Sequence, residues 1–162
     1  MQIDGHALMD RVTGAIEGRD PQLVTRLVTH DVHYEDPFGR MPHVGAQELV
    51  DRVSSVWEAF PDLRVEATGP CLHDGDRIVA LPLRGFGNHR GWLGQLPATE
   101  RFVNVHGVLV CELDATAHRL HRVRLFLDRY GAAVQLGALP EEGTVGDRAL
   151  RALQGFGLLR RR

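Results

Sequence analysis

The sequence predicts an α+β fold: a cone-shaped, curved, mainly antiparallel β-sheet that wraps around N-terminal helices and encloses a pocket. The first 60 residues contain three segments in which apolar residues recur at helical spacing. From residue 62 onward the pattern changes to long strands separated by short turns. A run of helices followed by a run of strands is typical of the α+β class, and such a sheet leaves a pocket where it curls over its helices.

Apolar spacing predicts helices over residues 5–18, 21–28 and 45–59. Asp20 is placed to cap the second helix, with Pro21 in its first turn. Pro61 follows the end of the third helix, where a proline commonly stands. Between the second and third helices, the stretch DVHYEDP (31–37) alternates and ends at a proline, which predicts a short strand.

Four long strands follow, two around the turn HDGD (73–76) and two around DATAH (114–118). The stretch GAAVQLGALP (131–140) then predicts a short closing helix. We therefore expect one domain over residues 1–140. Residues 141–162 are predicted to form an extension, with a short helix near 145–153 and a basic, solvated end.

Composition excludes several classes of protein. The 162 residues suit one globular domain, and a net charge of −2 gives no general reason to expect nucleic acid or an anionic membrane as partner. The chain contains no lysine, which removes Schiff-base chemistry. Cys71 and Cys111 stand in apolar, strand-like runs and are expected to be buried free thiols. Without a signal peptide or a long apolar segment, a cytoplasmic location is expected.

Several stretches resemble the nuclear-transport-factor-2-like superfamily over roughly residues 5–140. EDPFGRMPHVGAQELV (35–50) is similar to ketosteroid isomerase, whose catalytic aspartate lies in a closely similar Glu-Asp-Pro sequence. The other stretches resemble the SnoaL-like polyketide cyclases: FPDLRVEATGPCLHDGDRIV (60–79), GNHRGWLGQLPATERFVNVHGVLV (87–110) and FLDRYGAAVQLGALP (126–140). The superfamily hosts many unrelated functions, so the resemblance implies the fold more directly than the function.

Asp128 is the residue that the cyclase resemblance implies as general acid/base of an intramolecular aldol ring closure. Its strand parity is shared with Phe126 and Arg124, so Asp128 faces the pocket if Phe126 does. Alternatively, Asp128 pairs with Arg124 or caps the segment that starts at Tyr130. If Arg124 faces outward, the neighbouring leucines face inward and the parity argument weakens.

Asn104 and His106 share one face of a strand and fall where the cyclases place a polar residue and a histidine. The resemblance implies that they polarise a carbonyl group and stabilise the oxyanion that develops on it. In the alternative reading both side chains point outward, and the opposite face, with Val103 and Val105, is buried.

Asp36 is the residue that the isomerase resemblance implies as a carbon-acid base, with Tyr34 on the same strand parity. The isomerase also requires a tyrosine and a protonated aspartate, which correspond to positions near Val12 and Leu109. Neither of these side chains can donate a hydrogen bond, which argues against steroid isomerisation. Asp36 is thus either a second pocket carboxylate or the start of a turn with Pro37.

Four more side chains are candidates for contact with a flat ligand, beside Tyr34, Phe126 and Arg124. Trp57, Phe86 and Trp92 are possible pocket walls, although such aromatic residues also suit a plain core. His89 is a candidate for the pocket mouth, although a loop histidine is often solvated. The histidine spacing matches no metal-ligand motif, so no metal is predicted.

The predicted function is a cofactor-free cyclase or isomerase that acts by acid/base chemistry on a hydrophobic, carbonyl-bearing, polyketide-like small molecule. Two other reactions on the same scaffold remain open: double-bond isomerisation with Asp36 as base, and epoxide opening. A non-catalytic small-molecule-binding module is an alternative of another class. The resemblance also implies a homodimer formed through the outer face of the sheet.

Overall fold

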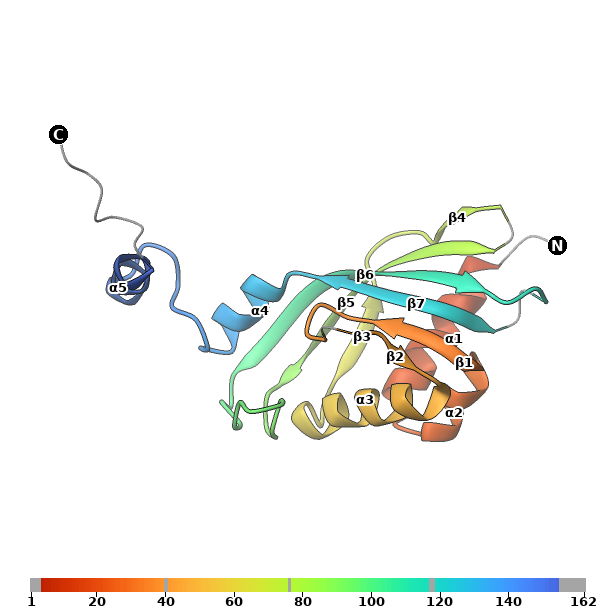
Figure 1. Ribbon diagram of the computed structural model, residues 1–162, viewed down its shortest axis with the longest axis horizontal. Helices are drawn as coiled ribbons and strands as arrows, with labels where there is room; N and C mark the ends of the chain where they lie inside the picture. Colours follow the sequence, from red (N-terminus) through yellow and green to blue (C-terminus); the bar gives the residue numbers. More distant parts are fainter. Residues whose placement is uncertain (1–3, 40, 76, 117–118, 155–162) are drawn as a thin grey trace.

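The computed structural model describes residues 4–39, 41–75, 77–116 and 119–154 (Figure 1). Within them the helices are α1 (Gly5–Glu17), α2 (Pro21–Leu27), α3 (Ala46–Ala59), α4 (Arg129–Gln135) and α5 (Val145–Leu153). The strands are β1 (Val28–Glu35), β2 (His43–Val44), β3 (Arg64–Ala67), β4 (Leu72–Asp74), β5 (Ile78–Asn88), β6 (Phe102–Leu113) and β7 (Leu120–Leu127). The α+β class predicted from the sequence is confirmed.

The strands form one curved sheet in the order β2-β1-β7-β6-β5-β3, with β4 also paired to β5. All neighbouring strands are antiparallel except β1 and β7, which run parallel. Helices α1, α2 and α3 lie together along one side of the sheet (Figure 1). The long strands β5 and β6 pair over their full length and form the back wall of the space between sheet and helices.

The first two helices begin where the sequence supplies a cap. The Asp4 carboxylate accepts hydrogen bonds from the backbone N–H groups of His6 and Ala7 at 3.1 Å, and Asp20 caps α2, whose first residue is Pro21. Helix α2 ends one residue earlier than predicted, because Val28 already has an extended backbone and begins β1. A β-branched residue at that position favours the strand.

The main core lies between the three N-terminal helices and the inner face of the sheet. It includes Leu8, Val12, Val24, Leu49, Val79, Leu81 and Leu113. Cys111 is fully buried in this core as a free thiol, and burial raises its pKa to about 12. Cys71 is also free but only half-buried, so the prediction of two buried thiols is confirmed for Cys111 alone.

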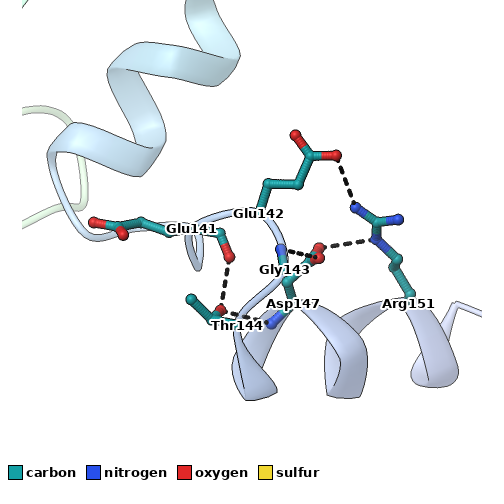
Figure 2. Close-up of polar contacts among 6 residues, drawn as sticks. All are labelled: Glu141, Glu142, Gly143, Thr144, Asp147 and Arg151. Atoms are coloured by element: carbon teal, nitrogen blue, oxygen red, sulfur yellow. Dashed lines mark hydrogen bonds and ion pairs between the residues drawn. The ribbon is translucent and has the colours of Figure 1, made fainter.

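The C-terminal extension forms a separate short helix, α5, that stands away from the sheet beyond α4 (Figure 1). Figure 2 shows polar contacts that are made within this segment. Thr144 caps the helix by accepting from the N–H of Asp147, and the buried Asp147 carboxylate accepts from the N–H of Gly143 and from Arg151 Nε, both at 2.9 Å. The predicted basic end lies outside the described residues. In the described part of the chain, no helix combines the length and apolar character needed to cross a bilayer.

Candidate functional site

Two adjoining cavities lie between the sheet and the helices. The first, here named the aliphatic chamber, has a volume of about 230 Å³ and is lined by side chains of α1, α2 and α3 and by strands β1, β3, β5, β6 and β7. The second, here named the carboxylate chamber, has a volume of about 170 Å³ and includes Asp36, Phe38 and Arg52 in its wall. The two chambers share several wall residues: Tyr34, Val56, Leu63, Gly85, Val105, Leu125 and Leu127.

Strand parity decides which side chains reach the chambers. Because successive residues of a strand point to opposite faces, alternate positions of β6 and β7 line the cavity wall. On β6 these are Val103, Val105, Gly107 and Leu109, and on β7 they are Val123, Leu125 and Leu127. The inner surface of both strands is therefore apolar.

Asp36 is the carboxylate in the wall of the carboxylate chamber. It follows β1 directly, and Pro37 begins the turn after it. One carboxylate oxygen accepts from the backbone N–H groups of Phe38 at 2.8 Å and Gly39 at 3.1 Å. The other accepts from Arg52 Nε at 2.6 Å, and the Asp36 side chain is only 1% exposed. Both predictions about Asp36 thus hold at once: it forms a turn with Pro37, and it lines the cavity.

The surroundings of Asp36 keep its carboxylate ionised. Burial alone would raise its pKa, but the hydrogen bond from Arg52, those from the backbone N–H groups of Phe38 and Gly39, and the positive charge of Arg52 outweigh burial and lower the pKa. Tyr34 lies two residues earlier on β1, is buried and lines both chambers. Burial, the nearby Asp36 charge and a hydrogen bond to Asp36 raise its pKa, so the phenol stays protonated and acts as a hydrogen-bond donor.

The ring of Phe38 lies close to two arginine side chains at the edge of the carboxylate chamber. The guanidinium carbon of Arg52 is 5.8 Å from the centre of its ring, and that of Arg129 is 5.7 Å away. Arg129 Nη1 also donates to the Pro37 carbonyl at 3.1 Å, which ties the start of α4 to the turn that holds Asp36. The turn is thus held from both sides.

Arg52 and Arg129 were missed by the sequence analysis. For Arg52 a signal existed: it lies three residues after Leu49 and four before Val56, within the apolar stripe of α3. A charged residue in such a stripe needs a buried partner of opposite charge. For Arg129 no comparable signal is present in the sequence.

The predicted placement of Asp128 in the cavity is wrong. Its side chain is exposed, and it caps α4 by accepting from the N–H of Gly131 at 2.8 Å, as the capping alternative supposed. Phe126, on the same parity, is 56% exposed, whereas Leu125 and Leu127 line the chambers. The parity of β7 is therefore the reverse of the one expected.

Arg124 also faces the outer side of the sheet. Its Nη2 donates to Glu112 Oε1 at 3.1 Å, so it pairs neither with Asp128 nor with Asp36. The predicted contact of Arg124 with a pocket ligand is wrong because its neighbours in sequence, Val123 and Leu125, occupy the inner face.

Asn104 and His106 lie on the outer face of β6, as the second of the two readings expected. His106 is exposed, and neither residue lines a chamber. The backbone of Asn104 is bracketed by Gln135 of α4, which accepts from its N–H at 2.7 Å and donates to its carbonyl at 3.0 Å. Neither side chain is placed to polarise a carbonyl group inside the cavity.

The aromatic candidates divide between core, wall and surface. Trp57 is buried in the core, where its Nε1 donates to the Ile16 carbonyl at 2.7 Å, and Trp92 is 64% exposed. Neither lines a chamber, so both are wrong as pocket walls. Phe86 does border the carboxylate chamber, with its ring also beside Phe102.

His89 is fully buried, so it is neither a residue at the pocket mouth nor a solvated loop histidine, as the sequence analysis had considered. Its Nδ1 accepts from the Thr99 N–H at 3.2 Å, and its ring packs on Phe60 with 5.2 Å between ring centres. Burial lowers the pKa of its imidazole, so the ring is neutral at ordinary pH. It joins the loop between β5 and β6 to the core. Among the described residues, no group of three or more His, Cys, Asp or Glu side chains could hold a metal ion.

The fold and its cavities place the chain among the α+β proteins in which helices cover one side of a curved, mainly antiparallel sheet. The family model of the SnoaL-like polyketide cyclases matches residues 6–136, and the chain belongs to that family. No curated protein matches the sequence at a significant level.

Solved structures share the fold at low sequence identity. A protein from Jannaschia sp. CCS1 assigned to the SnoaL-like polyketide cyclases has a TM-score of 0.72 at 18% identity, covering 84% of this chain and 93% of that one. AclR from Streptomyces galilaeus, assigned as a hydroxylase, has a TM-score of 0.72 at 20% identity, covering 94% and 92%. A protein of ketosteroid isomerase-like fold from Catenulispora acidiphila DSM 44928 has a TM-score of 0.68 at 14% identity, covering 85% and 95%. At these identities the likeness concerns the fold alone.

Proposed function

We propose that this protein is an acid/base catalyst that forms an enolate from a hydrophobic, carbonyl-bearing substrate, with Asp36 as the base. The observation that carries the proposal is the position of Asp36. Among the described residues that line the two chambers it is the single carboxylate, its side chain is 1% exposed, and Tyr34, a proton-bearing donor, stands on the same wall. A base and a hydrogen-bond donor beside one apolar cavity are what enolate formation requires.

The low pKa of Asp36 restricts the substrate. A carboxylate with a lowered pKa is always ready to accept a proton, but it is a weak base. It is therefore matched to a carbon acid that is already acidified, such as a C–H between two carbonyl groups. Poly-β-ketone chains contain such carbons, and this agrees with the family to which the chain belongs.

The proposed reaction moves protons and one electron pair. Asp36 takes the proton from the carbon between the two carbonyl groups, and the electron pair of the broken C–H bond passes into the enolate. Tyr34 donates a hydrogen bond to the enolate oxygen. In a ring closure the enolate carbon then attacks a second carbonyl of the same molecule, and the proton held by Asp36 returns to the new alkoxide. The one proton transferred is the proton that Asp36 removes from the substrate and later returns, and no oxidant or reductant is needed.

Ring closure and double-bond isomerisation share the first step and differ in where the proton returns. Isomerisation by Asp36 remains the second reaction on this scaffold, and epoxide opening the third. Binding without catalysis is the candidate of another class, and one observation favours it: three donors already occupy the Asp36 carboxylate. Loss of a proton-transfer step on substitution of Asp36 separates catalysis from binding.

The test uses ethyl 2-hexylacetoacetate, which has one acidic C–H and an apolar chain. Exchange of that hydrogen for deuterium is followed by NMR in buffered D₂O, above the rate without protein. We expect the protein to accelerate exchange and Asp36→Asn to reduce the acceleration by about 10²- to 10⁴-fold. Asp128→Asn is the matched control, because asparagine caps a helix as well as aspartate does and Asp128 is exposed outside the chambers. Full exchange by a folded Asp36→Asn variant would refute the proposal.

We also propose a homodimer that forms through the outer face of the sheet. This face carries exposed aromatic side chains, including Phe102 at 57% and Phe126 at 56%. Large apolar side chains exposed on one face support the proposal that another protein covers that face. The family resemblance implies that this other protein is a second copy of the same chain.

A further inference from the structure

We propose that the substrate carries a flexible aliphatic chain of several carbons, which occupies the aliphatic chamber while its dicarbonyl group lies at Asp36. This inference rests on the proposed function for the position of the reacting end. It differs from the flat polycyclic ligand that the sequence analysis expected, and three features of the chambers support it.

The first feature is the chemistry of the aliphatic chamber. Apart from Tyr34 and two glycines, every residue that lines it is alanine, valine, leucine or isoleucine. A hydrocarbon chain needs no hydrogen-bond partner and gains from the removal of its surface from water. The oxygen atoms of a hydroxylated or quinone-type ring would lose their water here without a replacement partner, which is costly. The chamber therefore selects against oxygenated rings.

The second feature is the way the chambers meet. Tyr34, Val56, Gly85 and Val105 belong to the walls of both, so the volumes adjoin rather than stand apart. The polar groups, Asp36 and Arg52, belong to the carboxylate chamber alone. A ligand that spans both chambers is thus polar at one end and hydrocarbon at the other.

The third feature is the glycine at the junction. Gly85 pairs with Val105 across β5 and β6, and both residues line both chambers. A Cβ added at Gly85 would lie 3.9 Å from its nearest neighbours, the Arg64 carbonyl and Leu63 Cδ1, so a side chain fits there without a clash. At Gly87, two residues on, a Cβ would be 3.0 Å from Asp62 and 3.3 Å from the Leu63 backbone. A Cβ is thus crowded at Gly87, whereas Gly85 has room for one. The missing side chain at Gly85 leaves the passage between the chambers open.

The test measures affinity against chain length. Ethyl 2-alkylacetoacetates with alkyl groups from methyl to decyl are titrated into the protein by calorimetry. Each methylene that enters an apolar site should tighten binding about fourfold until the chamber is full, after which affinity levels off. Affinity that does not depend on chain length in the unmodified protein would overturn the inference.

Gly85→Leu places a branched side chain at the junction and should remove most of this dependence on chain length. Gly69→Leu is the matched control, because Gly69 is exposed and a Cβ there makes only ordinary contacts with Pro82 at 3.8 Å. Val53→Phe, which narrows the aliphatic chamber from α3, gives a second route if Gly85→Leu fails to fold. Folded variants of both kinds that still bind the decyl compound as tightly as the unmodified protein would refute the inference.

The outcome is separable from that of the proposed function. Asp36→Asn should lose hydrogen exchange yet keep the dependence of affinity on chain length. If exchange by the unmodified protein is absent while chain-length dependence is present, the catalytic proposal fails and the chain-binding inference stands. If the protein accelerates exchange, but neither the exchange rate nor the binding affinity depends on chain length, the chain-binding inference fails and the catalytic proposal stands.

Discussion

Replacing Arg52 by methionine should destabilise the protein in a way that depends on pH. Arg52 Nε donates to the Asp36 carboxylate at 2.6 Å, and the two side chains are 22% and 1% exposed. Methionine keeps much of the packing volume but leaves a buried carboxylate without its cation. Removing one partner of a buried pair costs about 3–5 kcal/mol. Because Asp36 keeps two backbone donors and Arg52 is partly exposed, we expect a smaller cost than this, about 2–3 kcal/mol at pH 7.

The sign of the pH dependence follows from the pKa of Asp36. In the unmodified protein this pKa is lowered from its ordinary value of 3.8, so the Asp36 carboxylate contributes stability above about pH 4 that is lost as the pH falls through the lowered pKa. Arg52→Met removes the strongest of the effects that lower the pKa, so the carboxyl group protonates at a higher pH in the folded variant. Protonation relieves the buried charge, and the stability difference between the two proteins should narrow from pH 7 to pH 4.

The assay is urea unfolding followed by circular dichroism at pH 7, 5.5 and 4. A matching thermal scan at pH 7 should show the melting temperature lowered by roughly 4–12 °C, given about 2–4 °C per kcal/mol for a chain of this size. Arg84→Met is the control, because its pair with Glu66 is exposed, at 40% and 49%, and should contribute at most about 1 kcal/mol. A cost below about 0.5 kcal/mol for Arg52→Met, or a cost unchanged between pH 7 and pH 4, would contradict this account of the site.

Three further predictions concern the donor, the outer face and the extension. Tyr34→Phe removes the hydroxyl group but keeps the ring in the chamber wall, so it should slow the exchange reaction by about 10²- to 10³-fold. The circular dichroism spectrum should stay unchanged. An unaltered exchange rate would show that Tyr34 takes no part in the mechanism. Phe126→Glu places a charge on the outer face and should convert the proposed dimer to a monomer in light scattering, and a monomeric unmodified protein would count against the dimer. Removing residues 141–162 should leave the melting temperature within about 2 °C, because the polar contacts of α5 are made within that segment, and a larger drop would show that it packs on the domain.

The elements of the fold could be predicted because local patterns encode them. Asp20 and Pro21 mark the start of α2 whatever lies around it, and β4 pairs with β5 through near neighbours in the chain, such as Asp74 and Ile78. Val28 was predicted in the helix but begins the strand: its β-branched side chain favours an extended backbone, yet its apolar character also fitted the helical stripe. The parallel pairing of β1 with β7 joins residues more than 80 positions apart, such as Glu35 and Arg124, which no local pattern reveals.

The face of β7 was misread although its sequence carried a signal: Arg122 and Arg124 lie on one parity, and Val123, Leu125 and Leu127 lie on the other. Leu125 and Leu127 line the cavity, while Phe126 on the other face is exposed. A period-two pattern assigns residues to two faces but does not say which face is inside unless one of them is clearly polar. Phe126 was expected on the inner face because it is aromatic. Asp128 shares its strand parity and was therefore assigned to the same face. For Asp36 the sequence left two readings open, a pocket carboxylate and a turn residue, and the structure combines them, with Tyr34 buried two residues away on the same strand parity.

The structural and chemical roles of Asp36 are parts of one arrangement. A carboxylate that begins a turn accepts backbone N–H groups, and these donors stabilise its charged form whether or not it takes part in a reaction. The same donors, with Arg52, allow the charge to exist at 1% exposure, where an unassisted carboxylate would become neutral. They thereby weaken it as a base and confine it to acidified carbon atoms. The turn thus limits the chemistry available at Asp36. The aliphatic walls beyond Gly85 restrict the part of the substrate that lies away from Asp36 to a hydrocarbon chain.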